Sequence, residues 1–304
     1  MAKKLKIYYA NIYITNVCNL NCPGCYYFNN FKYKGHQNLA ELKSVYQRWA
    51  EELEIERINI LGGEPTLHPQ FKEWVMLARD TFNPGLTEPK PGVFRSNLIV
   101  TTNGTHLNKI PEWFNFFSEQ KVSLDISLHN PADEYELLEE IKAAIPTKRT
   151  KLDEGDGYHK KYFIVDTDDN VTAIGFEWWF SQGPLIETAP GSFKLHDSDV
   201  EIAHSNCVHS VCHTFKDGKL YKCGTVAQFP DLLEQFDLDV SVKDKELMLA
   251  YKPLSVDDTV ETKKEFIDNL RKSIPQCKFC PEKYIGDEIF AGKGVKPYIK
   301  IKSV

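Results

Sequence analysis

The chain has 304 residues, 42% of them apolar and 12% aromatic, and a formal net charge of −6. This composition suffices for a substantial core and excludes the disordered and low-complexity classes. The acidic balance argues against a nucleic-acid-binding protein, which normally presents a basic face. No segment approaches the roughly 18 apolar residues of a membrane span, and the first residues show no signal peptide. We therefore expect a cytoplasmic protein with neither a nucleic-acid nor a membrane partner.

The first 145 residues alternate between strand and helix patterns. The predicted strands cover 6–15, 56–61, 97–102 and 122–128, and the predicted helices cover 39–54, 69–80, 110–119 and 133–145. Strands that alternate with helices form βαβ units and a parallel sheet. Their number favours a partial (β/α)6 TIM-like barrel over a full eightfold barrel.

The pattern weakens after residue 145. Two further strands are expected around 161–165 and 172–180, and the Gly/Pro-rich stretch 181–192 is the expected boundary or linker. Beyond it, HTFKDGKLYKC predicts a β-hairpin that turns at Asp217-Gly218, with helical segments near 230–236 and 258–273. We therefore expect a barrel domain over 1–200 and a small α+β domain over 201–304.

Three of the eight cysteines lie in the segment CNLNCPGC, directly after the first predicted strand. In a reducing cytosol, metal binding explains such clustering better than disulfides do. Thiolates from Cys18, Cys22 and Cys25 can hold three corners of a cubane cluster and leave the fourth iron open. Zinc is the alternative, but a structural zinc usually needs four protein ligands, and only His36 lies near enough in sequence to serve as the fourth.

The segment LGGEPTLHP begins where the second predicted strand ends. Its residues should therefore lie beside the cysteine loop, because the carboxyl ends of parallel strands meet at one edge of a sheet. Glycines there allow the backbone to approach a small ligand closely. Alone, GGEP would equally suit a simple turn between a strand and a helix.

Together, CNLNCPGC and GGEP resemble the radical S-adenosylmethionine (SAM) superfamily. The resemblance implies a [4Fe–4S] cluster on the three cysteines, with SAM bound to the open iron. It also implies that Gly62, Gly63, Glu64 and Pro65 bind SAM. TTNG (101–104) and ISLH (126–129) match positions that commonly contact SAM, which adds Thr102, Asn103 and Ser127. In that superfamily the residue before the third cysteine is often aromatic and lies beside the adenine of SAM, whereas this chain has Gly24 at that position. Tyr26 or Tyr27 could supply the aromatic ring instead.

The resemblance further implies a radical reaction. An electron from an external donor such as flavodoxin or ferredoxin leads to cleavage of SAM, and the resulting 5′-deoxyadenosyl radical removes a hydrogen atom from the substrate. The candidates for proton transfer are Tyr26, His129 and Glu177. Trp178 and Trp179 lie on the same late strand as Glu177 and could line the cavity or belong to the core.

Five more cysteines follow position 200: Cys207, Cys212, Cys223, Cys277 and Cys280. A hairpin thiol paired with a remote C-x2-C brings four thiolates together, either for a cluster or for a zinc ribbon. The region resembles the twitch and SPASM extensions of radical SAM enzymes, which implies one auxiliary [4Fe–4S] cluster. The spacing between Cys207, Gly218 and Cys223 fits that family and leaves Cys212 as the spare thiol.

The expected reaction is oxidation or rearrangement of a small polar substrate, such as a sugar or nucleotide-sugar. The overall layout also resembles a radical SAM group associated with surface-polysaccharide and glycan pathways. A peptide- or protein-modifying maturase or activase is the second hypothesis. A non-enzymatic iron–sulfur or zinc protein is the third, and GGEP argues against it because a structural cluster needs no SAM pocket.

Overall fold

The computed structural model describes most of the chain. The described residues are 3–20, 22, 25–31, 33–90, 93–106, 112–128, 143, 149–154, 160–167, 170–178, 185–189, 192–207, 209–236, 238 and 240–283. His129, Trp179 and all but one residue of the helix expected over 133–145 lie outside this set. Glu177 and Trp178 are described through their backbone alone.

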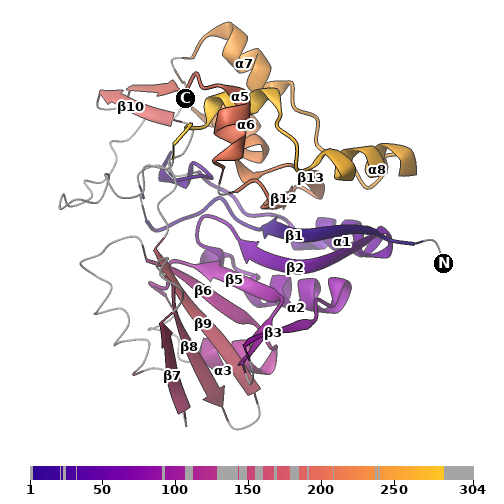
Figure 1. Ribbon diagram of the computed structural model, residues 1–304, viewed down its shortest axis with the longest axis vertical. Coiled ribbons are helices and arrows are strands. Elements are labelled where there is room, and N and C mark those ends of the chain that lie inside the picture. The colour runs from indigo at the N-terminus through magenta and orange to yellow at the C-terminus, as the bar shows by residue number, and fades with distance from the viewer. Residues whose placement is uncertain are drawn as a thin grey trace.

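A nine-stranded open sheet forms the centre of the fold, in the order β13-β12-β1-β2-β5-β6-β9-β8-β7 (Figure 1). Its strands are β1 (Leu5–Tyr13), β2 (Leu53–Leu61), β5 (Leu98–Thr102), β6 (Ser123–Leu128), β7 (Arg149–Glu154), β8 (Lys160–Thr167), β9 (Asn170–Trp178), β12 (His213–Lys216) and β13 (Lys219–Tyr221). The strands from β12 through β9 pair in parallel, whereas β13, β8 and β7 pair antiparallel with their neighbours. This open, largely parallel sheet confirms the predicted partial barrel.

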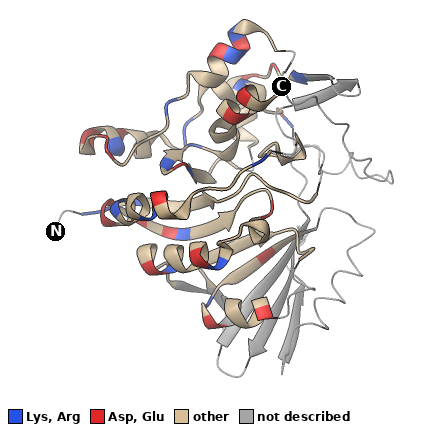
Figure 2. Cartoon of the chain, turned by 180° about the vertical axis from the view of Figure 1, so that it is seen from behind, with Lys and Arg blue, Asp and Glu red and all other residues tan. Residues whose placement is uncertain are grey.

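Helices cover one face of the sheet. They are α1 (Leu39–Glu52), α2 (Phe71–Phe82) and α3 (Glu112–Glu119), visible behind the strands in Figure 1 and in front of them in Figure 2. The Asn38 side chain caps α1 by accepting a hydrogen bond from the amide of Ala40. Trp49 and Trp74 are fully buried in the core with Ile60 of β2.

The opposite face of the same strands is polar. Because side chains alternate along a strand, Asn59 points away from the helices that its neighbours Ile58 and Ile60 contact. Asn59 is aligned with Asn11 of β1; its amide donates to Asn11 Oδ1 at 3.2 Å, and its own Oδ1 accepts from Thr101 Oγ1 at 3.0 Å. A hydrogen-bonded polar ladder therefore crosses β1, β2 and β5.

The C-terminal part packs on the β1 edge of the sheet (Figure 1). Its helices are α5 (Val200–Ser205), α6 (Gly224–Gln235), α7 (Val242–Leu249) and α8 (Val260–Asn269), followed by the 3-10 turn η4 (Pro275–Phe279). The predicted hairpin is confirmed as β12–β13, with φ of 51° at Asp217 and 71° at Gly218. Because β12 pairs directly with β1, this hairpin extends the barrel sheet.

Several elements differ from the sequence-based expectations. Residues 181–192 were expected to be a domain boundary or linker; β10 (Leu185–Ala189) and β11 (Ser192–Leu195) form a hairpin there. A second small hairpin, β3 (Leu86–Lys90) with β4 (Val93–Ser96), precedes β5, and α7 was not predicted. These short elements lack a clear hydrophobic period, which is the main signal available from sequence.

Two global properties bear on partners. No helix among the described residues is long and apolar enough to cross a membrane. On the face shown in Figure 2, basic and acidic side chains are interspersed over the described helices.

Candidate functional site

The cysteine loop leaves the sheet at the end of β1 and returns to the same place. Thr15 and His36 form a bridge at its base, and the amide of Asn16 donates to Gly35 O at 3.0 Å. Thr15 Oγ1 and His36 Nδ1 are 2.8 Å apart. His36 therefore closes the base of the loop and has one ring nitrogen engaged there.

The two glycines of GGEP pack directly against this loop. The amide of Gly63 donates to Thr15 O at 2.7 Å. A Cβ atom on Gly63 would lie 2.5 Å from Val17 O and 2.9 Å from Cys18 Cβ, and one on Gly62 would lie 2.7 Å from Thr15 Cγ2. Only glycine permits so close an approach of two backbones, so these residues fix the position of the first thiol.

Glu64 joins the end of β2 to the end of β5 through hydrogen bonds. Its buried Oε1 accepts hydrogen bonds from Thr66 N, Thr66 Oγ1 and Thr102 Oγ1, and its Oε2 accepts one from Asn103 N, at 2.6–3.1 Å. Burial raises the pKa of this carboxyl, and the hydrogen bonds oppose the rise. Glu64 therefore has a positioning role for the loop after β5, and its direct contact with SAM stays a prediction.

The loop after β5 is also tied to the cysteine loop. Asn103 Nδ2 donates to Asn19 Oδ1 at 2.8 Å, and Asn19 Nδ2 donates to Thr105 Oγ1 at 2.6 Å. Asn19 was not predicted as a site residue, although its place inside CNLNC was a signal. Ser127 is buried near the end of β6. The predicted residues thus gather at the carboxyl edge of the sheet.

The environment of Cys25 suits a cluster ligand. Burial raises the pKa of its thiol, while backbone hydrogen bonds from Tyr27, Phe28, Asn29 and Asn30 lower it. Amide groups directed at a sulfur stabilise its anionic form and are a normal feature of iron–sulfur sites. Together with the glycine cradle at Cys18, these amides fit a thiolate-bound cluster in this loop.

Four of the five later cysteines converge. They line one small cavity and perturb one another electrostatically: Cys207, Cys223, Cys277 and Cys280. Burial is the largest cause of the raised pKa of Cys207, to about 11, and Cys223 and Cys277 add to it. The hairpin, the α5 end and η4 therefore bring together the four thiols that the sequence pairing favoured.

Cys212 lies apart from these four. It is not among the residues that line their cavity; instead its thiol contributes to the raised pKa values of Tyr9 and Tyr27, for both of which burial is the main cause. Tyr27 also bonds Asn11 at 3.2 Å and Thr214 at 3.3 Å. Cys212 therefore faces the barrel side of β1.

Tyr26 connects the two thiol groups. It follows Cys25 in the chain, but its hydroxyl lies within hydrogen-bonding reach of Cys223, and its ring stacks on His209 with centroids 3.9 Å apart. Burial, and then Cys223 and Cys207, raise its pKa. Tyr26 therefore lies in the second thiol site, and Tyr27 is the aromatic residue nearer to the polar ladder.

Among the residues that the structure describes, no three His, Cys, Asp or Glu side chains lie close enough together to hold one metal ion.

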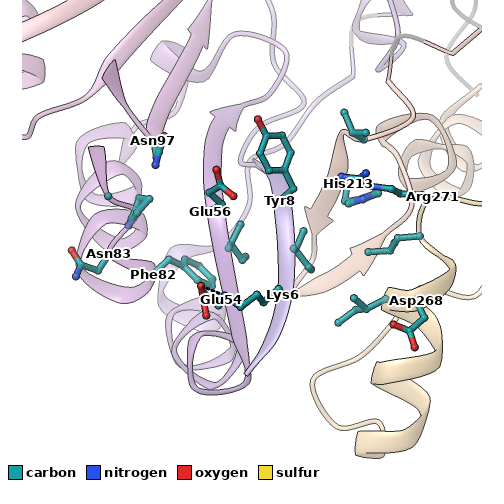
Figure 3. Close-up of a pocket in the computed structure, with 17 residues that line it drawn as sticks. Lys6, Tyr8, Glu54, Glu56, Phe82, Asn83, Asn97, His213, Asp268 and Arg271 are labelled. Atoms are coloured by element: carbon teal, nitrogen blue, oxygen red, sulfur yellow. Dashed lines mark hydrogen bonds and ion pairs between the residues drawn. The ribbon is translucent and has the colours of Figure 1, made fainter. Parts of the chain in front are cut away.

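A larger pocket of about 590 Å³ lies elsewhere (Figure 3). Its walls include Lys6 and Tyr8 of β1, Glu54 and Glu56 of β2, and Arg271 after α8. Residues 6–8 and 54–56 belong to the first halves of their strands, whereas the cysteine loop and GGEP follow the strand ends. This pocket contains none of the predicted cofactor residues.

Comparisons with known proteins indicate the family. Residues 12–152 match the family model described as the radical SAM superfamily. The chain is similar to GTP 3′,8-cyclase from Photorhabdus laumondii, with 31% identity over 112 residues, covering 36% of this chain and 30% of that protein. For GTP 3′,8-cyclase from Pectobacterium atrosepticum the identity is 32% over 113 residues, covering 36% and 31%. The matched segment thus spans about a third of the length of these relatives.

Solved structures show weaker likenesses. BtrN in complex with AdoMet and 2-DOIA aligns with a TM-score of 0.31 and 19% identity, covering 42% of this chain and 48% of that chain. SuiB from Streptococcus suis bound to S-adenosylmethionine aligns with a TM-score of 0.34 and 15% identity, covering 47% and 35%. The match to the family model coincides with the cysteine loop, GGEP and the loop after β5. Residues 12–152 therefore carry a domain of the radical SAM superfamily, whose cofactors are S-adenosylmethionine and a [4Fe–4S] cluster.

Proposed function

We propose that this radical SAM enzyme acts on a small polar substrate, such as a sugar, a nucleotide or a nucleotide-sugar. We also propose a second [4Fe–4S] cluster on Cys207, Cys223, Cys277 and Cys280. Residues 1–200 would form the SAM-dependent barrel and 201–304 the domain of the second cluster.

The local geometry supports the proposed first cofactor site. Cys18, Cys22 and Cys25 would hold the cluster, and the backbone of Gly62 and Gly63 would face SAM. When bound, the cluster and SAM supply the 5′-deoxyadenosyl radical that removes a hydrogen atom from the substrate. The chain's own contribution is to hold the loops at fixed distances through Glu64 and to exclude water from the buried edge of the sheet.

The observation that carries the substrate proposal is the polar ladder on the barrel side of the sheet. Asn11 and Asn59 are almost fully buried and are hydrogen-bonded to each other and to Thr101, so this side of the sheet is lined by polar groups, which suits a polar substrate better than an apolar one. On the same face, Arg57 has a buried Nε without a hydrogen-bond partner among the described residues. A guanidinium group favours anionic groups such as phosphate, and the similarity to GTP 3′,8-cyclases is consistent with a nucleotide or nucleotide-sugar.

The second thiol group supports an oxidative outcome. A cluster there could accept the electron that a substrate radical releases when it also loses a proton, which completes a two-electron oxidation of a carbon–hydroxyl group. Tyr26 supports this assignment because it joins the first loop to Cys223. Its hydroxyl is engaged there, which argues against Tyr26 as the proton-transfer group in the substrate site.

The test is anaerobic turnover by the reconstituted full-length protein. We expect 5′-deoxyadenosine on reduction with SAM, and increased formation with one class among GTP, nucleotide-sugars, free sugars and peptides. Deuterium from the labelled substrate should appear in 5′-deoxyadenosine. Replacement of Cys18, Cys22 and Cys25 by alanine is the matched control. Absence of SAM cleavage by the loaded protein would overturn the enzyme assignment, and stimulation by peptides alone would overturn the substrate class.

A further inference from the structure

Lys222 is a buried cation beside the second thiol group. It is 4% exposed and lines the same cavity as Cys207, Cys223 and Cys277. Burial lowers the pKa of its ammonium group, and the three sulfurs raise it. Its Nζ donates a hydrogen bond to Leu270 O at 2.5 Å.

Among the described residues of the C-terminal part, two other lysines are buried, and they are compensated differently. Lys216 forms ion pairs with Asp217 and Asp231, at 3.0 and 3.1 Å, and Lys263 pairs with Glu52 at 2.5 Å. Among the described residues, Lys222 forms no ion pair with a carboxylate. A buried charge without compensation is strongly unfavourable. The groups placed to compensate Lys222 are therefore the sulfurs.

From this contrast we propose that Lys222 is a positioning residue that sets the reduction potential of the second cluster. This inference rests on the second cluster of the proposed function. A cluster with four thiolates is anionic and gains another negative charge on reduction, and net charge is one of the factors that set its potential. The Lys222 ammonium stabilises the reduced form more than the oxidised form, so it raises the midpoint potential and makes the cluster a better electron acceptor.

A purely structural role is the alternative, since the bond to Leu270 O also links β13 to the end of α8. Two substitutions separate the roles. Lys222→Gln removes the charge but keeps an N–H donor for the carbonyl, whereas Lys222→Arg keeps the charge. Lys219→Met is the matched control, because Lys219 is exposed and lies on β13, the short strand that directly precedes Lys222.

The experiment is a potentiometric titration of the reconstituted full-length protein, monitored by electron paramagnetic resonance. The signal of the second cluster is the one retained when Cys18, Cys22 and Cys25 are replaced by alanine. We expect Lys222→Gln to lower its reduction equilibrium constant at least tenfold, which corresponds to 59 mV for a one-electron couple. Lys222→Arg and Lys219→Met should leave the midpoint near that of the wild type.

An unchanged midpoint in Lys222→Gln with full iron content would overturn the role of Lys222 while the second cluster stands. An equal shift in Lys219→Met would overturn it as well. If Lys222→Gln fails to incorporate the second cluster but Lys222→Arg incorporates it, the requirement for a cation is supported. Wild-type protein with no second iron–sulfur signal would instead overturn the proposed second cluster itself.

Discussion

Individual buried polar side chains hold the candidate site together. Glu64 is the clearest example, since two backbone amides and two hydroxyl groups converge on a carboxylate with no exposed surface. A carboxylate accepts from all of these donors, whereas an amide would direct its own hydrogens at some of them.

We predict that Glu64→Gln lowers the free energy of unfolding by about 1–3 kcal/mol, because at least one buried donor loses its acceptor. Anaerobic urea denaturation measures the change. Glu73→Gln, at an exposed position of α2, is the control and should be neutral. Equal stability of the Glu64 and Glu73 variants would contradict this account of Glu64.

His213 gives the stability a dependence on pH. The ring is 4% exposed, its Nδ1–H donates to Lys222 O at 2.9 Å, and burial lowers its pKa from 6.5 to about 4. Because the pKa is lower in the folded state, the stabilisation is present above about pH 6.5 and is lost as the pH falls towards 4.

We predict that the wild type loses about 2 kcal/mol more stability between pH 7 and pH 5 than His213→Asn does, since asparagine donates the same hydrogen bond without titrating. Denaturation curves at both pH values provide the comparison. Comparing the two proteins cancels any acid lability of the clusters that they share. Parallel losses in both would refute the assignment to His213.

At the scale of elements, the start of α6 packs against Tyr27 of the cysteine loop. Its first residue, Gly224, faces the ring of Tyr27: a Cβ atom there would lie 2.1 Å from Tyr27 Cε1. That ring is also stacked on Tyr13 with centroids 5.1 Å apart and cannot retreat without breaking its bonds to the polar ladder. Gly224 does not have a left-handed φ, so glycine is required there because a larger side chain would clash with Tyr27.

We predict that Gly224→Ala destabilises the protein by about 1–3 kcal/mol through overpacking and displaces Tyr27 from Asn11. Thermal denaturation and the ultraviolet spectrum of the tyrosines measure the two effects. Gly85→Ala is the control, because a Cβ atom at Gly85 meets nothing within 4 Å. If Gly224→Ala had the melting temperature of the wild type, the prediction would be wrong, because Tyr27 would then have moved aside without a loss of stability.

For the whole molecule, the C-terminal part is built onto the barrel. Trp49 Nε1 of α1 donates to Gly218 O at 2.8 Å, and Lys263 of α8 pairs with Glu52 of α1. The hairpin that contains Gly218 also leads into Cys223. Attachment of the hairpin to the sheet therefore determines where the second thiol group lies relative to the first.

We predict that Cys207→Ala removes the iron of the second cluster, whereas Cys212→Ala keeps it, because only Cys207 shares the cavity with the other three thiols. Iron and sulfide analysis of the reconstituted variants, with spectra of both clusters, gives the answer. The first cluster should persist in both variants. Loss of equal iron in Cys212→Ala would contradict the assignment.

Local patterns in the sequence determined the alternating strands and helices, the hairpin at Asp217-Gly218 and the placement of GGEP beside the cysteine loop. These features follow from short-range spacing and from the rule that parallel strands end at one edge. The hydrogen bonds of Glu64 and Asn19 to the loop after β5 were not predicted, because their partners lie tens of positions away in the sequence. Of the catalytic candidates, only Tyr26 has a described side chain, and it points to the second thiol group.

The sequence by itself therefore determined the chemistry at the first site, since three thiols on one loop and a glycine pair after the next strand need no distant partner to be placed. For the later thiols, the spacing favoured one set of four, and the tertiary structure brought that set into one cavity and placed the Lys222 cation beside it. Cys223 and Cys277 are far apart in the chain, and their approach depends on how α5 and η4 pack beside the hairpin. Such packing is a sum of many weak contacts, which no single motif encodes.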